Sequence, residues 1–487
     1  MSISTKASAS DQRVGDDAWF STTRRGPTPV TSRLDGNRRS RRHYYVVLLL
    51  AGLICLVGGM ASTTGAQEAD GTSPESPTLN VPSQLPFVDR TQFIDRGVIE
   101  YRVPQQLRDG IPVGDARTIA DIGPLLDWLN QTEQKNQAFK LGKGPLHRRK
   151  PKKATDPILA GCVDSVLIAK DGKLVVEEYF ADANRDKPHY QMSITKSILA
   201  FAIGKAIEQG KIESENDLIL KYLPEVDTAQ IAKGVDRLTL KDLLTMNSGI
   251  RIPKGSPNQG ATPQNQAQRY LSQTKPIPKN PTYKYDGSNC ELLVHILYNV
   301  SGQTLGEYVG QHLFGPMGIG DFSFGQSASG LDKGAAGMRL RSRDMLKIGM
   351  MTAAGGLWEG RRILNTEWVT RATKPHVNFD KPTQYGYFWW SHEAQLGDET
   401  VRVRSCRGAG GQFIFVVPEK KLVAVVTSYY ADNRPIRYFD TLILPAFAAG
   451  SEKDSAEDET LTQDGLAPKR IGVGDGERWT EEPDLKV

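Results

Sequence analysis

A serine and a lysine stand three residues apart in "YQMSITKSILAFAIGKAIEQG", residues 190–210. Apolar residues recur after Ser193 for about four helical turns, so the sequence predicts a buried helix that begins at Ser193 and ends at Gly210. Residues i and i+3 share a helix face, which brings the amine of Lys196 within reach of the serine hydroxyl. Burial is expected to lower the pKa of Lys196, which favours a base that activates Ser193 as a nucleophile.

The same residues also fit a purely structural interpretation. Serine is a favoured N-cap residue, and its side chain then accepts a backbone N–H in the first helical turn. Lys196 fits this alternative less well, because the N-terminal end of a helix disfavours a cation. The chain holds a second Ser-x-x-Lys at 272–275, followed by Pro276 and Pro278, which is expected in a polar loop. Spacing alone therefore does not decide between the two interpretations.

Composition places the chemistry in a globular body and excludes a nucleic-acid partner. The chain has 487 residues, 39% of them hydrophobic, which is enough for a sizeable core. Residues 1–45 hold nine basic and four acidic residues, a surplus that equals the formal charge of +5 of the whole chain. The basic cluster at 147–153 is interpreted as a solvated loop. No Cys/His spacing indicates zinc, and no cofactor is expected.

The N-terminal region, residues 1–66, has the layout of an export signal. Arginines precede an apolar run at 46–60, and Thr64 and Ala66 supply small residues before a cleavage site. The run is shorter than the ~18–20 residues of a comfortable membrane span, although an uncleaved anchor is the alternative. The body is therefore expected outside the cytoplasmic membrane, periplasmic or secreted, and attached to the membrane only through this segment if at all.

The remaining boundaries follow from composition. Residues 67–95 are rich in Pro, Ser and Thr and are interpreted as a linker, and 451–487 is an acidic tail expected to be disordered. Residues 96–450 are expected to form one globular unit. Its three cysteines are an odd number for an exported protein, so at least one thiol is unpaired unless it bonds another chain: Cys162, Cys290 and Cys406.

Strand signals lie at both ends of this unit, with helical segments between them. An Asp-Gly turn at 170–172 joins two β-rich runs, and two further strands are predicted at 413–417 and 422–427. An apolar stripe within 116–134 predicts an N-terminal helix. The sequence thus predicts an α+β fold, with an antiparallel sheet built from N- and C-terminal segments, flanking helices and a mostly helical subdomain.

The order of these blocks resembles the serine β-lactamase and penicillin-binding superfamily, and most closely its class C-like esterase branch with the 6-aminohexanoate-dimer hydrolases. The resemblance covers roughly residues 96–450 and implies the β-lactamase/DD-peptidase-like fold. The blocks that carry it are, in order, "SVLIAKDGKLVVEEYF", "SITKS", "LTLKDLLTMNSGI", "YDGSNCELLVHILYNVSGQTLGEYVGQHLFGPMGI", "MRLRSRDMLKIGMM", "GRRILNTEWV", "YGYFWW" and "SCRGAGGQFIFVV".

The resemblance implies a role for each motif residue. Ser193 resembles the acylating nucleophile, Lys196 its base, and Tyr285 the tyrosine that relays a proton to the leaving group, with Tyr283 as its competitor. The third motif falls on Ala409, Gly410 and Gly411 and implies that Gln412 donates the second oxyanion N–H; the alternative for the glycines is a tight turn before a strand.

Two departures from the family pattern narrow the expected substrate. Ala409 stands where β-lactamases and peptidases keep a lysine that binds a carboxylate, and Gly287 stands where the pattern has asparagine. Both losses favour a small ester or amide over a penicillin-type substrate. The alternatives are a β-lactamase, a D-alanyl-D-alanine peptidase or other penicillin-binding protein, or a non-catalytic cell-wall binding scaffold of the same fold. The sequence leaves the oligomeric state open.

Overall fold

The structure is a computed structural model that describes residues 97–140, 163–180, 183–252, 260–380, 383–428 and 434–448. The chain divides into two units, Met1–Ser76 and Pro77–Val487, and every described residue belongs to the second. The predicted export signal, linker and acidic tail lie outside the described residues, as do the basic cluster at 147–153 and Cys162. Within the described ranges, no helix is long and apolar enough to cross a membrane.

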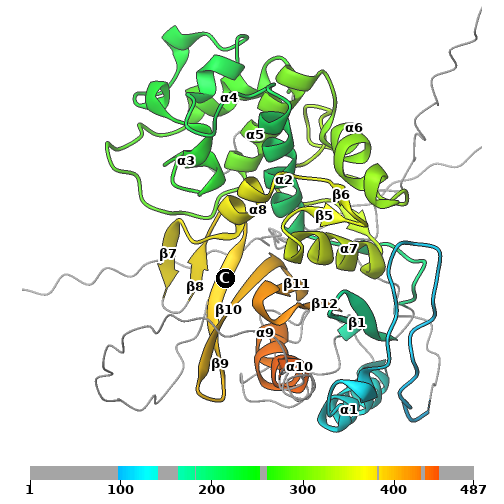
Figure 1. Cartoon of the computed structure of the whole chain (residues 1–487). Coiled ribbons are helices and arrows are strands. Elements are labelled where there is room, and N and C mark those ends of the chain that lie inside the picture. Colours follow the sequence, from blue (N-terminus) through cyan, green and yellow to red (C-terminus); the bar gives the residue numbers. More distant parts are fainter. Residues whose placement is uncertain are drawn as a thin grey trace, which may run out of the picture. The chain divides into compact units, whose positions relative to one another are not determined.

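An eight-stranded antiparallel sheet forms the centre of this unit (Figure 1). Its strand order is β2-β1-β12-β11-β10-β9-β8-β7. The strands are β1 (Val163–Lys170), β2 (Lys173–Tyr179), β7 (Val377–Asp380), β8 (Thr383–Tyr385), β9 (Trp390–Leu396), β10 (Glu399–Gly408), β11 (Gln412–Val417) and β12 (Leu422–Ser428). Because β1 pairs with β12, the N- and C-terminal segments share one sheet, as predicted.

The predicted hairpins form where the sequence placed their turns. Lys170 pairs with Lys173, and both turn residues, Asp171 and Gly172, have positive φ values of 51° and 76°. Positive φ at both central positions gives the turn the twist that suits a two-residue hairpin, and Asp-Gly tolerates it. The strands predicted at 413–417 and 422–427 are confirmed as β11 and β12.

Helices cover both faces of the central strands β1, β11 and β12, which are buried along their whole length. Side chains alternate between two cores along β1: Leu167 packs in one core, whereas Val166 packs in the other. The first core contains α2, α5 and α7, and the second contains α1 and α10. Two-sided burial explains why the strands read as continuous apolar runs rather than as a polar/apolar alternation.

A mostly helical subdomain lies between the N- and C-terminal parts of the sheet in the sequence, and Figure 1 shows α3–α6 gathered beyond α2. The helices are α1 (Gly123–Lys140), α2 (Ile194–Glu208), α3 (Leu240–Leu244), α4 (Gln266–Gln273), α5 (Ser288–Ser301), α6 (Leu305–Val309), α7 (Ser342–Ala353), α8 (Thr366–Thr373), α9 (Arg434–Tyr438) and α10 (Leu444–Ala448). Two short ladders, β3 (His189–Tyr190) with β4 (Arg339–Leu340) and β5 (Leu357–Trp358) with β6 (Arg361–Arg362), complete the regular structure. The fold is the predicted α+β, β-lactamase/DD-peptidase-like fold.

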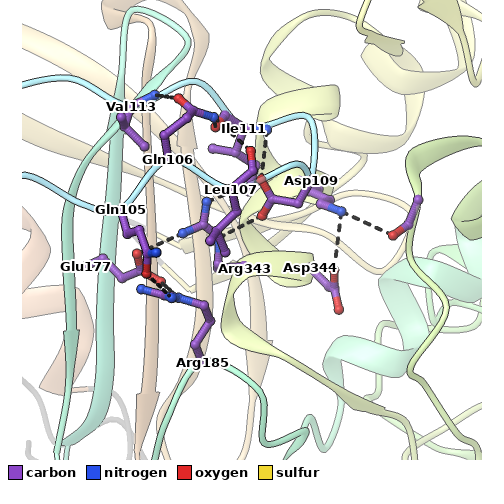
Figure 2. A network of polar contacts seen from close by, with 12 residues as sticks. Gln105, Gln106, Leu107, Asp109, Ile111, Val113, Glu177, Arg185, Arg343 and Asp344 are labelled. Carbon is purple, nitrogen blue, oxygen red and sulfur yellow. Dashed lines mark hydrogen bonds and ion pairs between the residues drawn. The ribbon is translucent and has the colours of Figure 1, made fainter.

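A buried arginine, Arg343, connects the segment before α1 to the sheet (Figure 2). The guanidinium of Arg343, on α7, lies 2.8 Å from a carboxylate oxygen of Asp109 and 2.8 Å from one of Glu177 on β2. Arg185 forms a second ion pair with Glu177, at 3.1 Å. The side chain of Arg343 is 4% exposed, so its charge depends on these two carboxylates rather than on water.

Replacement of Arg343 is therefore expected to be costly. Arg343→Met leaves the Glu177 carboxylate buried without its main partner, and we expect it to lower the free energy of unfolding by about 3–5 kcal/mol. The matched control is Arg402→Met, which breaks an exposed pair with Glu393 and should cost less than about 1 kcal/mol. Urea denaturation of the three proteins measures both values, and equal small losses would show that the buried network contributes little.

Candidate active site

The hydroxyl of Ser193 is not used as a helix cap. Ser193 occupies the N-cap position of α2, but its φ and ψ of −72° and −3° are helical and its side chain makes no capping hydrogen bond. The preceding Met192 has a positive φ of 49°, a conformation that costs a non-glycine residue about 1–3 kcal/mol. The strain and the absent cap both argue against the purely structural interpretation of this serine.

Lys196 points its amine at Ser193 from one turn along α2. Its Nζ lies 3.0 Å from the serine Oγ and also donates to the carbonyl oxygen of Ala335. The residue is only 4% exposed. The other Ser-x-x-Lys, at 272–275, lies at the end of α4, and both of its motif residues are exposed. Ser272 thus lies in the last turn of a helix rather than in the expected polar loop, but the motif does not open a helix, as predicted.

Tyr285 completes a cluster with these two residues. The Lys196 Nζ lies 4.9 Å from the centre of the Tyr285 ring, a cation–π distance. Tyr285 is 37% exposed, so the cluster has a face open to solvent. The competitor Tyr283 instead packs edge-on against the buried Tyr385, with ring centres 5.3 Å apart. The structure brings together Ser193, Lys196 and Tyr285.

The protonation of Lys196 differs from the sequence-based expectation. Burial lowers the pKa of Lys196, as expected, but its neighbours Tyr285, Cys290 and Glu291 raise it, and the resulting pKa lies above the ordinary value of a lysine. The net direction is therefore opposite to the one expected from burial alone. In the resting protein Lys196 is an ammonium group that donates to Ser193.

The β10–β11 hairpin approaches the serine through a glycine. A Cβ on Gly408 would lie 2.4 Å from the carbonyl oxygen of Gln191, two residues before Ser193, so only glycine fits here. The following Gly410 and Gly411 form the hairpin turn, with φ values of 82° and 92°, and Gly411 N–H donates to Gly408 O at 3.2 Å. Their conformation alone accounts for these two glycines, which matches the tight-turn alternative.

Gln412 lies one step beyond this turn, at the start of β11. It pairs with Gly408 and is fully buried, and its side-chain amide donates to the carbonyl oxygen of Ser428 at 2.6 Å. Its role as an oxyanion donor stays a prediction. Gly408 makes the close approach to the Gln191–Ser193 segment, so the N–H of the next residue, the exposed Ala409, is a second candidate from this hairpin.

The asparagine missing at Gly287 is not replaced by Asn289. The carboxamide oxygen of Asn289 accepts from Ser248 Oγ at 2.6 Å, and its nitrogen donates to Asp286 O at 3.0 Å. Asn289 is fully buried and holds two loops together. Its amide is thus committed to structural contacts rather than to Lys196.

The two arginines near the third motif have different surroundings. Arg404 forms an exposed ion pair with Glu419 at 2.9 Å. Arg407 bonds to the hydroxyl of Ser405 at 2.9 Å and lies 5.3 Å from the ring centre of Trp390, which itself packs against Tyr285. Burial lowers the pKa of Arg407 to about 10. Arg407 is therefore the one connected to the cluster, through an aromatic side chain.

Two residues of the site were missed from the sequence. Ala335 contributes only a backbone carbonyl, which no side-chain pattern reveals, although the glycines at 334 and 337 around it signal an irregular segment. Glu291 lies beside it on α5, and its carboxylate oxygen accepts the N–H of Ala335 at 3.2 Å. A lone acid within the apolar run "CELLVHIL" was the available signal for Glu291.

The fold is of the β-lactamase/penicillin-binding type, and a comparison with known families agrees with it. The Beta-lactamase family model matches residues 159–441, more than half of the chain. The protein belongs to the Beta-lactamase family, a β-lactamase-fold family of serine hydrolases that includes 6-aminohexanoate-dimer hydrolases and penicillin-binding protein homologues.

Individual relatives are distant. A 6-aminohexanoate-dimer hydrolase of Paenarthrobacter ureafaciens is 21% identical over 296 residues, covering 56% of this chain and 74% of that protein. An uncharacterized protein of Alkalihalophilus pseudofirmus is 25% identical over 299 residues, 54% of this chain and 82% of the relative. A penicillin-binding protein homologue from Pyrococcus abyssi is similar in structure, with a TM-score of 0.48 and 20% identity over 57% of this chain and 72% of that one.

The close approach of Gly408 yields a test of the site. In Gly408→Ala the new Cβ displaces either the hairpin or the Gln191–Ser193 segment, because the atom it meets is a backbone oxygen. We expect a fluorophosphonate probe to label Ser193 about 10²-fold more slowly, as misplaced reacting groups commonly cost that much.

Gly320→Ala is the control, since a Cβ there meets nothing within 4 Å. It should label at the wild-type rate. Wild-type labelling by Gly408→Ala would show that the hairpin does not set the position of Ser193.

Proposed function

We propose that this protein is an exported serine hydrolase that cleaves an ester or amide bond of a small molecule through an acyl-enzyme on Ser193. The observation that carries the proposal is the 3.0 Å contact between Lys196 Nζ and Ser193 Oγ, with the same amine lying against Tyr285. A buried lysine is costly to keep, and a binding scaffold of the same fold has no need of one aimed at a serine.

In the acylation step, the neutral form of Lys196 takes the hydroxyl proton of Ser193 as the serine oxygen bonds to the substrate carbonyl carbon. The carbonyl becomes a tetrahedral oxyanion, which backbone N–H groups stabilise. One is the N–H of Ser193 at the start of α2, where first-turn donors have no partner within the helix. The second comes from the β10–β11 hairpin, at Ala409 or Gln412.

Collapse of this intermediate breaks the bond to the leaving group. Tyr285 gives its hydroxyl proton to the departing oxygen or nitrogen and recovers a proton from Lys196, whose amine lies 4.9 Å from the centre of its ring. Water then enters, loses a proton to the same pair, and attacks the acyl carbon, which releases the acid and restores Ser193. Atoms and protons balance without an external reactant, and we propose no cofactor.

The third motif supports an uncharged small ester or amide as the substrate. Ala409 supplies no cation at the position where the family's β-lactamases and peptidases carry a lysine, so a penicillin-type carboxylate loses its partner. One relative is named a 6-aminohexanoate-dimer hydrolase, and that name is consistent with a linear amide. The aromatic side chains of Tyr285 and Trp390, 5.9 Å apart, offer an apolar surface beside the serine.

Labelling of the serine tests the catalytic proposal. A fluorophosphonate probe should label the wild-type protein, and Ser193→Ala should abolish labelling. Lys196→Met should slow it by about 10²–10⁴-fold, the usual contribution of a general base. Ser272→Ala is the matched control, since this serine belongs to the exposed second motif. Equal labelling of wild type and Ser193→Ala would overturn the proposal.

Substrate preference separates this function from its closest rival. The wild-type protein should hydrolyse a p-nitrophenyl ester and turn over a chromogenic cephalosporin slowly or not at all, because Ala409 provides no carboxylate partner. Fast cephalosporin turnover with an inert ester would instead identify a β-lactamase or a D-alanyl peptidase.

Export rests on the N-terminal sequence. The arginine-flanked apolar run at 46–60, which lies outside the described residues, supports passage of the body across the cytoplasmic membrane. If the export signal is cleaved, the mature protein should begin near residue 67. If it is an uncleaved anchor, the mature protein should still contain the apolar run at 46–60. Intact mass measurement of protein from the cell envelope decides between them, and full-length protein confined to the cytoplasm would contradict both.

A further inference from the structure

The carbonyl of Ala335 decides the orientation of the Lys196 amine. An ammonium group has three N–H donors and no acceptor. In this protein two of these donors bond to Ser193 Oγ and Ala335 O, and the amine also lies 4.9 Å from the centre of the Tyr285 ring. When the amine loses a proton, the N–H group that stays on the Ala335 carbonyl leaves the lone pair free to face Ser193. Without the Ala335 carbonyl, nothing forces the lone pair toward the serine.

Glu291 holds Ala335 in this position. Its carboxylate accepts the Ala335 N–H at 3.2 Å. Close packing reinforces the contact: a Cβ on Gly334 would lie 2.9 Å from Cys290 O, and one on Gly287 would lie 3.3 Å from the Ala335 Cβ. The 334–335 segment thus fits against the start of α5 with little freedom, and the Glu291 carboxylate holds it there through the N–H of Ala335.

The surroundings of Glu291 place its charge close to the reacting lysine. Burial raises the pKa of Glu291, whereas the backbone N–H of Ala335 and the cations Lys196 and Lys333 lower it. The net result is a pKa raised to about 7. Tyr270 on α4 and the neighbouring thiol of Cys290 are the other titratable groups whose protonation responds to this carboxylate. In turn, the charge of Glu291 raises the pKa of Lys196.

We propose that Glu291 is a positioning residue for Lys196, which fixes the Ala335 carbonyl that orients the amine and whose negative charge stabilises the ammonium form. This inference rests on the proposed function of Lys196 as the base. It assigns two separable effects to one carboxyl group. The hydrogen bond to Ala335 favours catalysis at every pH, whereas the charge delays the loss of the lysine proton as the pH rises.

Two substitutions separate these effects. Glu291→Gln keeps an oxygen that accepts the Ala335 N–H but removes the charge. Glu291→Leu removes both. A third variant, Lys333→Gln, removes a cation that favours the ionised form of Glu291, so Glu291 should ionise at a higher pH. Glu367→Gln is the matched control, because Glu367 is exposed on α8.

The pH dependence of kcat/KM for a p-nitrophenyl ester is the first measurement. The folded-state pKa of Lys196 is raised, so its neutral fraction, and with it kcat/KM of the wild type, should rise with pH. The rise should flatten near neutral pH, because Glu291 ionises there and its negative charge raises the pKa of Lys196. Glu291→Gln should lose the flattening and equal or exceed the wild type at about pH 8–9. Lys333→Gln should move the flattening to higher pH.

Glu291→Leu should instead lose about 10²-fold in kcat at every pH, as expected when a reacting group loses its orientation. Its melting temperature, measured alongside, shows whether the fold is retained. A Glu291→Leu variant that folds and matches Glu291→Gln in kcat would overturn the positioning role.

A direct titration of Lys196 needs no turnover and therefore separates failure of this inference from failure of the proposed function. The ¹³Cε resonance of Lys196, assigned by its loss in Lys196→Met, should titrate at a lower pH in Glu291→Gln than in the wild type, and unchanged in Glu367→Gln. An unchanged midpoint in Glu291→Gln would overturn the electrostatic part of the proposal, whether or not the protein hydrolyses any ester.

Discussion

The structure of the site depends on one constraint, the cost of keeping the amine of Lys196 out of water. A buried ammonium is tolerated only when all of its donors find acceptors. Here its partners come from three different places in the chain: the serine one turn back on α2 and the carbonyl of Ala335 accept its hydrogen bonds, and the ring of the tyrosine that precedes α5 lies 4.9 Å away. The same requirement that stabilises the lysine therefore assembles the site.

Burial of α2 makes this constraint possible. The helix packs within the core between the sheet and the helical subdomain, and its first turn, with Ile194 and Lys196, is enclosed. The sheet meets it through β10, where Gly408 allows backbone to touch backbone beside Gln191. If α2 were exposed on one side, water could accept the hydrogen bonds of the Lys196 amine. The amine would then not need Ser193 and Tyr285 as neighbours. The two-sided burial of the sheet and the geometry of the site are consequences of the same packing.

Local signals predicted the elements, and the contacts between distant segments were harder to predict. The Asp171-Gly172 turn and the start of α2 depend on residues close in sequence, and they form where the pattern indicated. The third motif shows the limit. Its residues were placed by order along the chain, but the pairing of Gly408 with Gln412 puts Gly410 and Gly411 in the turn itself. Which residue of a hairpin reaches a neighbouring helix is decided by strand register, and register is set by the whole sheet.

The protonation of Lys196 shows the same limit in electrostatic form. From the sequence, burial is the only visible influence on its pKa, and burial alone lowers it. The neighbours that reverse the sign, Tyr285 and Glu291, follow Lys196 by about ninety residues and reach it only after α5 packs on α2. Gly287, which departs from the family's asparagine, allows this arrangement, because a side chain there would press on Ala335. Gly287 and Glu291 thus serve the same arrangement: one leaves room for Ala335, and the other bonds its N–H, so that the backbone carbonyl supports the lysine.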